Sequence, residues 1–177
     1  MKQNERRRAP AIRCPISLGR FSGVLILRDS KAVGWPSESG ADCTTPAQAE
    51  AILRAAVPDP EVECFVMLSL NRAGRAITAR LVTTGTQGAT LISPQTLFRH
   101  ALQDGAAAVI VAHNHPSGSV NPSPEDCAAT QRLADAGRLI GIQFLDHLIL
   151  GAIGKCYSFN ESGPSFKRNY GGDVPEP

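Results

Sequence analysis

Residues 106–118 of this 177-residue chain read AAAVIVAHNHPSG. The apolar part, residues 107–112, has the composition of a strand that is buried on both faces. Successive side chains of a strand point to opposite faces, so His113 and His115 would share one face, and Asn114 would point away, if the strand continues through them. Two imidazoles on one face provide half of a zinc site. A third ligand is needed, because catalytic zinc is held by three protein side chains.

Asp126 is the candidate third ligand, because the loop of residues 116–122 can fold back and bring the start of the next helix to the strand end. Residues 123–126, with the sequence SPED, also have the pattern of a capping box, in which Asp126 would accept backbone N–H bonds. Two histidines near a strand end can equally be ordinary polar residues. The spacing therefore leaves a metal site and a helix cap as two interpretations, and Ser123 can serve the cap in either.

The rest of the chain alternates between strand and helix patterns, which predicts an α/β (α+β) fold with a mixed β-sheet flanked by helices. Two further helix starts are marked by a capping residue followed by proline, at Thr45-Pro46 and Ser93-Pro94. The expected elements, in chain order, are a helix at 47–57, strands at 63–70 and 76–82, a helix at 95–103, a strand at 107–112, a helix from 123 to about 139, and a strand at 142–150.

Composition and pattern divide the chain into three segments. Residues 45–159 form the predicted domain. Residues 1–44 form an N-terminal arm, in which a short hairpin is predicted between residues 23–27 and 31–35. Residues 160–177 are expected to be a flexible tail, because glycine, serine and proline are frequent there.

The charge is unevenly distributed along the chain. The net charge is +2, but the first 20 residues carry six Lys or Arg against one Glu, which leaves the other 157 residues at −3. The domain therefore lacks the basic surface typical of nucleic-acid binding, although the arginine-rich arm could contact phosphate. A solvated, solubilising tail is the alternative interpretation of the arm.

The sequence indicates a cytoplasmic protein without a membrane span. Its five cysteines are scattered and none has C-x-x-C spacing, which favours a reducing compartment. The longest apolar run, at residues 106–112, has seven residues, whereas a membrane helix needs about 20. No apolar stretch of the kind found in signal peptides follows the N-terminal arginines.

The combined motifs resemble a known family of metalloproteases. The strings HNHP at 113–116 and SPED at 123–126 look like the JAMM (JAB1/MPN+) motif. The longer string HNHPSG, followed by PSPED at 122–126 and LDH at 145–147, resembles the RadC-type bacterial branch. The resemblance covers about residues 45–159. It implies a JAB/MPN fold, which is cytidine-deaminase-like in shape.

By this resemblance, His113, His115 and Asp126 would hold a zinc ion. Glu63 matches the family's glutamate and would act as a general base, taking the proton of a zinc-activated water and delivering it to the leaving amine. The alternative for Glu63 is a solvent-facing residue on an edge strand beside Glu61.

The implied activity is that of a zinc-dependent hydrolase that cleaves a peptide or isopeptide bond in a protein or peptide substrate. Ser123 would donate its hydroxyl to the oxyanion. A non-hydrolytic metal-binding interaction module and a RadC-like DNA-associated factor are the alternatives. Residues 1–44 contain nothing like the helix-hairpin-helix region of full-length RadC members, which counts against the DNA role. A zinc deaminase is excluded by the missing P-C-x-x-C string. The oligomeric state has no signature in the sequence.

Two further polar residues interrupt the last predicted strand. Asp146 could orient a metal-binding imidazole as a hydrogen-bond acceptor, or make a structural hydrogen bond in the core, and the role of His147 stays open. His100 is expected to lie over the C-terminus of its helix. Cys127 points about 100° around the helix from Asp126 and is not expected to bind the metal.

Overall fold

The computed structural model describes residues 25–27, 40, 41, 43, 45–85, 92–152 and 154–162. In it, the stretch that carries the histidines forms strand β4 (Ala108–Asn114), all of whose residues are buried. The strand continues two residues beyond the end expected from composition. Because it includes His113 and Asn114, the alternation of faces extends into the motif.

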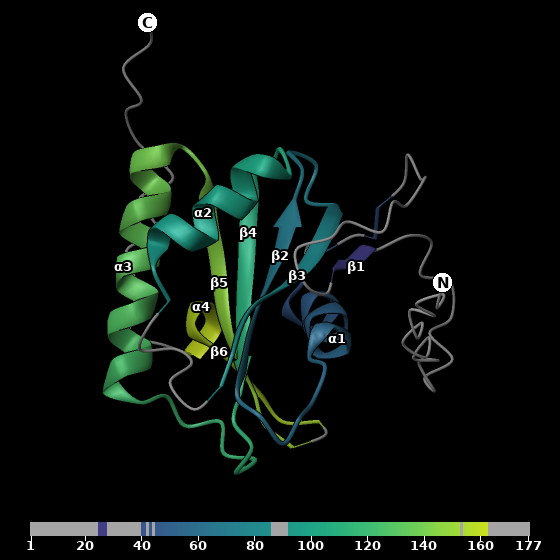
Figure 1. Cartoon of the computed structure of the whole chain (residues 1–177), viewed down its shortest axis with the longest axis vertical. Coiled ribbons are helices and arrows are strands. Elements are labelled where there is room, and N and C mark those ends of the chain that lie inside the picture. Colours follow the sequence, from purple (N-terminus) through teal and green to yellow (C-terminus); the bar gives the residue numbers. More distant parts are fainter. Residues whose placement is uncertain are drawn as a thin grey trace, which may run out of the picture.

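The six strands of the described part form one mixed sheet in the order β1-β3-β2-β4-β5-β6 (Figure 1). β4 lies inside the sheet, antiparallel to β2 (Cys64–Leu70) and parallel to β5 (Gln143–Leu150). On the far side of β2, β3 (Ala76–Thr84) pairs antiparallel with it, and β1 (Leu25–Leu27) pairs parallel with β3. The predicted fold class, a mixed sheet with flanking helices, is confirmed.

The three longer helices begin where the cap-and-proline pattern predicts. They are α1 (Pro46–Ala56), α2 (Pro94–Gln103) and α3 (Pro124–Ile140). In each, proline occupies the first turn, where its missing N–H removes no hydrogen bond. α3 ends at Gly141, which adopts the left-handed conformation with φ 78° that terminates helices.

Alternate side chains of the inner strands enter two separate cores, because helices cover both faces of the sheet. Val66 and Leu68 of β2 belong to the core under α1. Phe65 and Met67 belong to the core under α2 and α3. His113 stacks against Phe65, with ring centroids 6.2 Å apart, so it lies on the second of these faces.

Two short elements after β5 are absent from the sequence-based expectation. β6 (Cys156–Ser158) pairs antiparallel with β5, and α4 (Phe159–Ser162) follows it directly. Residues 160–162, assigned to the flexible tail by their composition, therefore lie in α4. The carboxylate of Asp146 accepts the backbone N–H of Asn160 at 2.9 Å and ties this helix to β5.

The predicted ends of the chain fall largely outside the described residues. β1 coincides with part of the first strand of the predicted hairpin, and it pairs with β3. The second hairpin strand, at 31–35, and the tail from residue 163 onward are outside the described residues. Among the helices that are described, none has both the length and the apolar character required to cross a membrane.

Candidate metal centre

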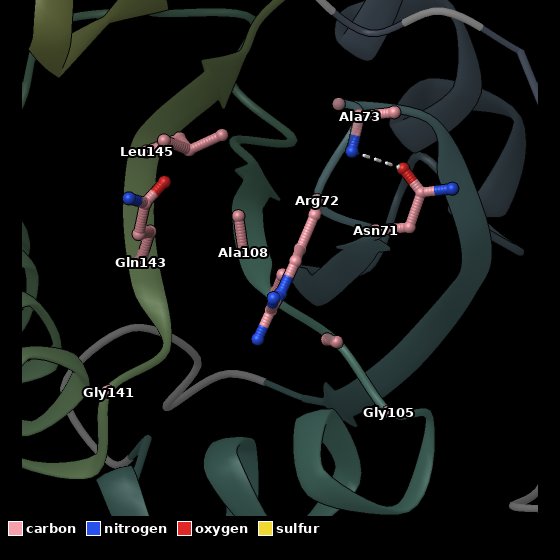
Figure 2. Close-up of a pocket in the computed structure, with 11 residues that line it drawn as sticks. Asn71, Arg72, Ala73, Gly105, Ala108, Gly141, Gln143 and Leu145 are labelled. Carbon is pink, nitrogen blue, oxygen red and sulfur yellow. Dashed lines mark hydrogen bonds between the residues drawn. The ribbon is translucent and has the colours of Figure 1, made fainter.

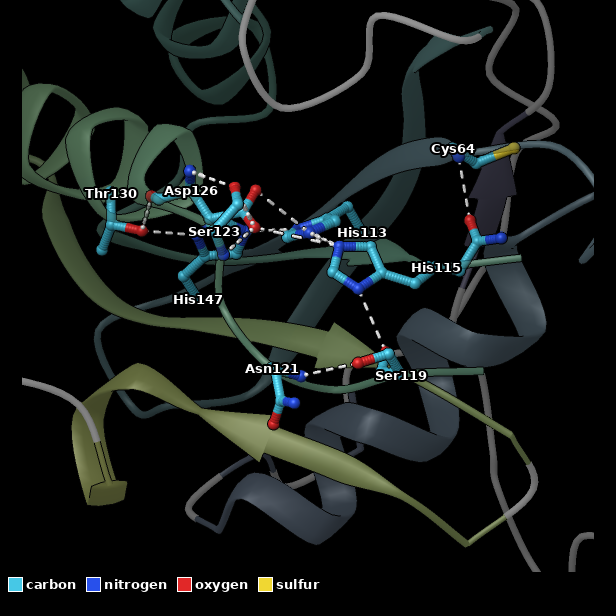
Figure 3. Close-up of polar contacts among 10 residues, drawn as sticks. Cys64, His113, His115, Ser119, Asn121, Ser123, Asp126, Thr130 and His147 are labelled. Atoms are coloured by element: carbon cyan, nitrogen blue, oxygen red, sulfur yellow. Dashed lines mark hydrogen bonds and ion pairs between the residues drawn. The ribbon is translucent and has the colours of Figure 1, made fainter. Parts of the chain in front are cut away.

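Three candidate ligands meet where β4 ends and α3 begins (Figure 3). The Nε2 atoms of His113 and His115 are 2.9 Å apart. Asp126 Oδ1 lies 3.3 Å from Nε2 of His113, and Asp126 Oδ2 lies 3.8 Å from Nε2 of His115. Within the described part of the chain, these are the residues whose donor atoms cluster in the manner of a metal site.

The separations of these donor atoms fit a tetrahedral ion. Ligand atoms about 2.1 Å from a zinc ion lie about 3.4 Å from one another in a tetrahedron. The three separations in the site, 2.9, 3.3 and 3.8 Å, span this value. Two neutral imidazoles and one carboxylate are also a donor set that zinc accepts, so the residues present fit this metal.

His115 forms the accessible side of the site. Its side chain is 20% exposed, whereas that of His113 is 0% exposed. Nδ1 of His115 lies 3.0 Å from the backbone oxygen of Ser119, which can only accept a hydrogen bond. Nδ1 must therefore carry the proton, and Nε2 presents its lone pair to Asp126 and His113.

Asp126 is both a helix-capping residue and a candidate ligand. Its Oδ2 accepts the N–H of Ser123 at 2.8 Å and the hydroxyl of Ser123 at 2.7 Å. Burial by itself would raise the pKa of Asp126, but the bonds from Ser123, together with the hydrogen bond and charge of His113 when its imidazole is protonated, outweigh it and hold that pKa well below its usual range. Asp126 is therefore ionised at neutral pH, as a metal ligand must be.

Ser123 occupies the N-cap of α3, as its position in the SPED string predicts. Its Oγ accepts the N–H of Asp126 at 3.1 Å, which completes a capping box with the Asp126 side chain. The metal-site and capping interpretations of this segment are compatible, because one carboxylate oxygen serves the cap while the other faces His113. The oxyanion role of Ser123 stays a prediction.

Glu63 lies immediately before β2 and is partly buried. The antiparallel register pairs Phe65 with His113, and continuing it by two residues brings Glu63 opposite His115. Because β2 lies between β3 and β4, the edge-strand alternative for Glu63 does not fit the sheet order. The register thus brings Glu63 to the end of the sheet that carries the histidines, and its role as a general base stays a prediction.

Asn114 holds the segment that carries Glu63, a function that the sequence analysis missed. Its Oδ1 accepts the N–H of Cys64 at 2.8 Å, and its Nδ2 donates to the backbone oxygens of Pro60 and Val62 at 3.1 and 3.0 Å. The side chain thereby closes the gap between the end of β4 and the start of β2. The only signal in the sequence is its place between the two histidines.

His113 also has a buried neighbour, His147, whose role the sequence leaves open. His147 Nε2 lies 2.8 Å from His113 Nδ1, and His147 Nδ1 lies 2.6 Å from the hydroxyl of Thr130 on α3. Burial holds the pKa of His147 well below its usual range, so the ring is neutral. A histidine within an apolar strand was the available signal, but the sequence does not reveal its partner.

The remaining predicted polar residues take structural positions. Asp146 accepts three hydrogen bonds from β5, β6 and α4, which supports the structural interpretation rather than the orientation of an imidazole. His100 lies in the last turn of α2, as expected, with Nδ1 3.3 Å from the Gln103 side chain. Cys127 is half-buried, packs against the core under α2 and α3, and is not among the donor atoms that cluster.

A groove of about 580 Å³ opens beside His115. Its walls combine apolar side chains, among them Val57, Pro116 and Leu150, with the polar groups of Asn114 and Ser117. It therefore offers space for an extended chain next to the exposed ligand.

A second hollow, of about 900 Å³, lies at the opposite end of β4 (Figure 2). Small residues such as Gly105, Ala108 and Gly141 line it, and the side chain of Arg72 extends across it. Ala108 and His113 are five residues apart on one strand, roughly 17 Å, so this hollow is separate from the candidate metal centre.

The fold and the site together define an α/β domain with a His-x-His pair at the end of an inner strand and an aspartate at the start of the next helix. The family model described as a RadC-like JAB domain matches residues 43–164. The chain belongs to this family, and the resemblance stated from its motifs is confirmed.

Similar curated proteins carry the name UPF0758. One from Rubrobacter xylanophilus is 42% identical over 108 residues, which are 61% of this chain and 48% of that protein. One from Pelodictyon phaeoclathratiforme is 44% identical over 107 residues, covering 60% and 48%. One from Trichormus variabilis is 48% identical over 89 residues, covering 50% and 37%. The chain thus spans about half or less of the length of these relatives.

Proposed function

We propose that this chain is a zinc-dependent hydrolase that cleaves a peptide or isopeptide bond. The observation that carries the proposal is the convergence of two imidazole nitrogens and a buried carboxylate, with one ligand open to a groove. Closed structural zinc sites use four protein ligands, whereas catalytic ones use three and leave a position for the reaction. Membership of the RadC-like JAB domain family supports the same activity.

When bound, zinc would supply a Lewis acid that activates water and polarises the substrate carbonyl. Glu63 would take the proton of the attacking water and return it to the leaving amine. Ser123 would turn its hydroxyl from Asp126 toward the developing oxyanion, a contribution of about 2.7–4 kcal/mol for one such donor. His113, His115 and Asp126 would hold the metal and take no part in proton transfer.

The substrate that fits the groove is an extended segment of a protein or peptide. Its apolar walls would take up side chains next to the scissile bond, while Ser117 offers its hydroxyl to a backbone. Cys64, Cys127 and Cys156 are free thiols, which is consistent with action in the reducing cytoplasm.

The test combines metal analysis with Glu63→Gln. We expect purified wild-type protein to contain one zinc per chain and His113→Ala to lose it. Glu63→Gln should keep the zinc and the fold but cleave a peptide found in a library screen about 10²–10⁴-fold more slowly, mainly through kcat, because glutamine cannot accept the proton.

The matched control is Glu125→Gln, which alters an exposed carboxylate beside the site and should retain wild-type kcat. Wild-type cleavage by zinc-loaded Glu63→Gln would refute the general-base role. Zinc binding by wild-type protein without cleavage of any peptide would instead favour the non-hydrolytic interaction module.

A further inference from the structure

His147 is a buried imidazole placed directly behind the candidate metal ligand His113. It lies on β5 opposite Val111 of β4, and its side chain is enclosed between the ring of Phe65, at 5.5 Å between centroids, and the ring of Phe159, at 5.0 Å. A buried imidazole requires a hydrogen-bond partner for each nitrogen. Both partners are present, and together they form a connected chain.

The chain of hydrogen bonds has three links. Thr130 Oγ1 donates to the backbone oxygen of Asp126 at 2.7 Å. His147 Nδ1 lies 2.6 Å from Thr130 Oγ1, and His147 Nε2 lies 2.8 Å from His113 Nδ1. The first and last members of the chain, Asp126 and His113, are both candidate ligands of the same ion.

The donor in each of the three hydrogen bonds follows from the donor in the first, the bond from Thr130 to Asp126. A backbone carbonyl can only accept, so the single proton of the Thr130 hydroxyl is committed to Asp126. Thr130 must therefore accept from His147, which places the His147 proton on Nδ1. Nε2 of His147 then has only a lone pair to offer, so Nδ1 of His113 must donate to it.

The consequence is a defined tautomer at the candidate metal ligand. With its proton on Nδ1, neutral His113 presents the lone pair of Nε2 to the site. His115 does the same, because its Nδ1 donates to the backbone oxygen of Ser119. Two lone pairs then face each other across 2.9 Å, an arrangement that a cation between them would stabilise.

We propose that Thr130 and His147 are positioning residues that form a one-way hydrogen-bond relay and hold His113 as the Nδ1–H tautomer for metal binding. The proposal rests on the metal site of the proposed function. It assigns the role of orienting group to a histidine and a threonine, where a carboxylate is the common choice. The relay also joins β4, β5 and α3, so the position of His113 is set by the same helix that supplies Asp126.

The first test is spectroscopic and does not depend on metal or activity. Long-range ¹H–¹⁵N spectra of the metal-free protein above neutral pH distinguish the two imidazole tautomers, and His113→Ala and His147→Phe assign the signals. We expect both rings to carry the proton on Nδ1 in the wild type. A proton on Nε2 of either ring would overturn the relay, whether or not the protein binds zinc.

The second test measures zinc affinity by competition with a chromophoric chelator. Thr130→Val keeps the shape of the side chain but removes the hydroxyl, and His147→Phe keeps a ring between the two phenylalanines but removes the acceptor. Each should weaken zinc binding about 10–100-fold. Thr130→Ser keeps a hydroxyl, and His147→Gln supplies a carbonyl oxygen that can accept in place of the imidazole Nε2. Both of these variants should keep most of the wild-type zinc affinity.

Phe159→Leu distinguishes a packing role of His147 from its role in the relay. This substitution disturbs the packing on His147 but none of the three hydrogen bonds. This variant should lower Tm while keeping the wild-type zinc affinity. Zinc affinity that follows Tm across all five variants, with no recovery in Thr130→Ser or His147→Gln, would refute the relay. Failure of the wild type to bind zinc would refute the metal site of the proposed function, while the spectra would still test the hydrogen-bond directions.

Discussion

At the scale of single residues, Asp146 shows how a buried carboxylate can serve structure beside a candidate metal site. It accepts the hydroxyl of Ser158 at 2.6 Å and the backbone N–H groups of His147 and Asn160 at 2.7 and 2.9 Å. Burial raises the pKa of Asp146, although these donors favour the ionised form. The carboxylate joins β5 to the segment that ends in α4.

We expect Asp146→Ala to lower the free energy of unfolding by about 2–5 kcal/mol, because it leaves buried donors unpaired. Asp146→Asn should cost less, since its carbonyl oxygen can still accept the two backbone N–H bonds. Both variants should retain wild-type zinc content. Urea unfolding and elemental analysis of the same samples check this, and loss of zinc without loss of stability would restore the orienting role of Asp146.

The pH dependence of the free energy of unfolding, compared between the wild type and Asp146→Asn, provides a second check. Between the ordinary aspartate pKa and its raised value in the folded state, folded protein holds a proton that the unfolded chain has released. The contribution of Asp146 to stability should therefore fall as pH rises through this window, and Asp146→Asn should lack this slope. The stability advantage of wild type over Asp146→Asn should be largest at the acidic end.

At the scale of secondary-structure elements, the start of α3 both caps its helix and supplies a candidate metal ligand, and the start of α1 offers a cap for comparison. Thr45 and Ser123 both form capping boxes, with Gln48 and Asp126 as the respective partners. The first box caps α1. The second holds Asp126, whose other carboxylate oxygen faces His113.

The two capping residues allow a prediction in which Thr45 serves as the control for Ser123. Thr45→Ala and Ser123→Ala should each lower stability by about 1 kcal/mol through the lost cap. Ser123→Ala alone should also weaken zinc binding or slow peptide cleavage, because it releases Asp126 and removes the proposed oxyanion donor. Parallel urea titrations and zinc competition measure both effects. Equal zinc affinity and equal cleavage rates in the two variants would limit Ser123 to capping.

At the scale of the whole molecule, a metal ion at this site would join an inner strand to the helix that covers it. An ion present at 100 times its dissociation constant adds about 2.7 kcal/mol to stability. Stripping the protein with a chelator should therefore lower Tm by about 5–10 °C. His113→Ala should show no such response, and a wild-type protein with unchanged Tm would contradict the site.

The same thermal shift should disappear in acid. Imidazoles ordinarily titrate near pH 6.5, and protons compete with metal for their nitrogens. The metal-dependent rise in Tm should be full at pH 7.5 and lost progressively below about pH 6. Asp126 does not account for this loss, because its pKa is held well below its usual range and it stays ionised.

The arginine-rich arm should be dispensable for the domain. Residues 1–13 lie outside the family match at 43–164. Their removal should leave zinc content and Tm unchanged and should lower retention on DNA mainly at low salt, as expected for phosphate contacts. A truncated chain that no longer folds or binds zinc would show that the arm is structural.

The sequence by itself determined the helix starts, the inner strands and the candidate ligands. These features are local: a capping residue before proline, an apolar run and a His-x-His spacing each depend on neighbours along the chain. The segment that carries Glu63 was also found by its motif, but the hydrogen bonds of Asn114 that hold it join residues about 50 positions apart. β6 and α4 lacked a strong local pattern and were missed.

Only the tertiary structure decided which of Asp146 and His147 lies behind His113. The β4–β5 register shifts by one residue between Val109 and Ile110, so that His147 rather than Asp146 lies opposite Val111. A one-residue shift exchanges the two faces of a strand. It therefore placed the imidazole behind His113 and the carboxylate toward β6 and α4. Such an irregularity depends on how two strands 35 or 36 positions apart along the chain pack together, so no local pattern in either strand could reveal it.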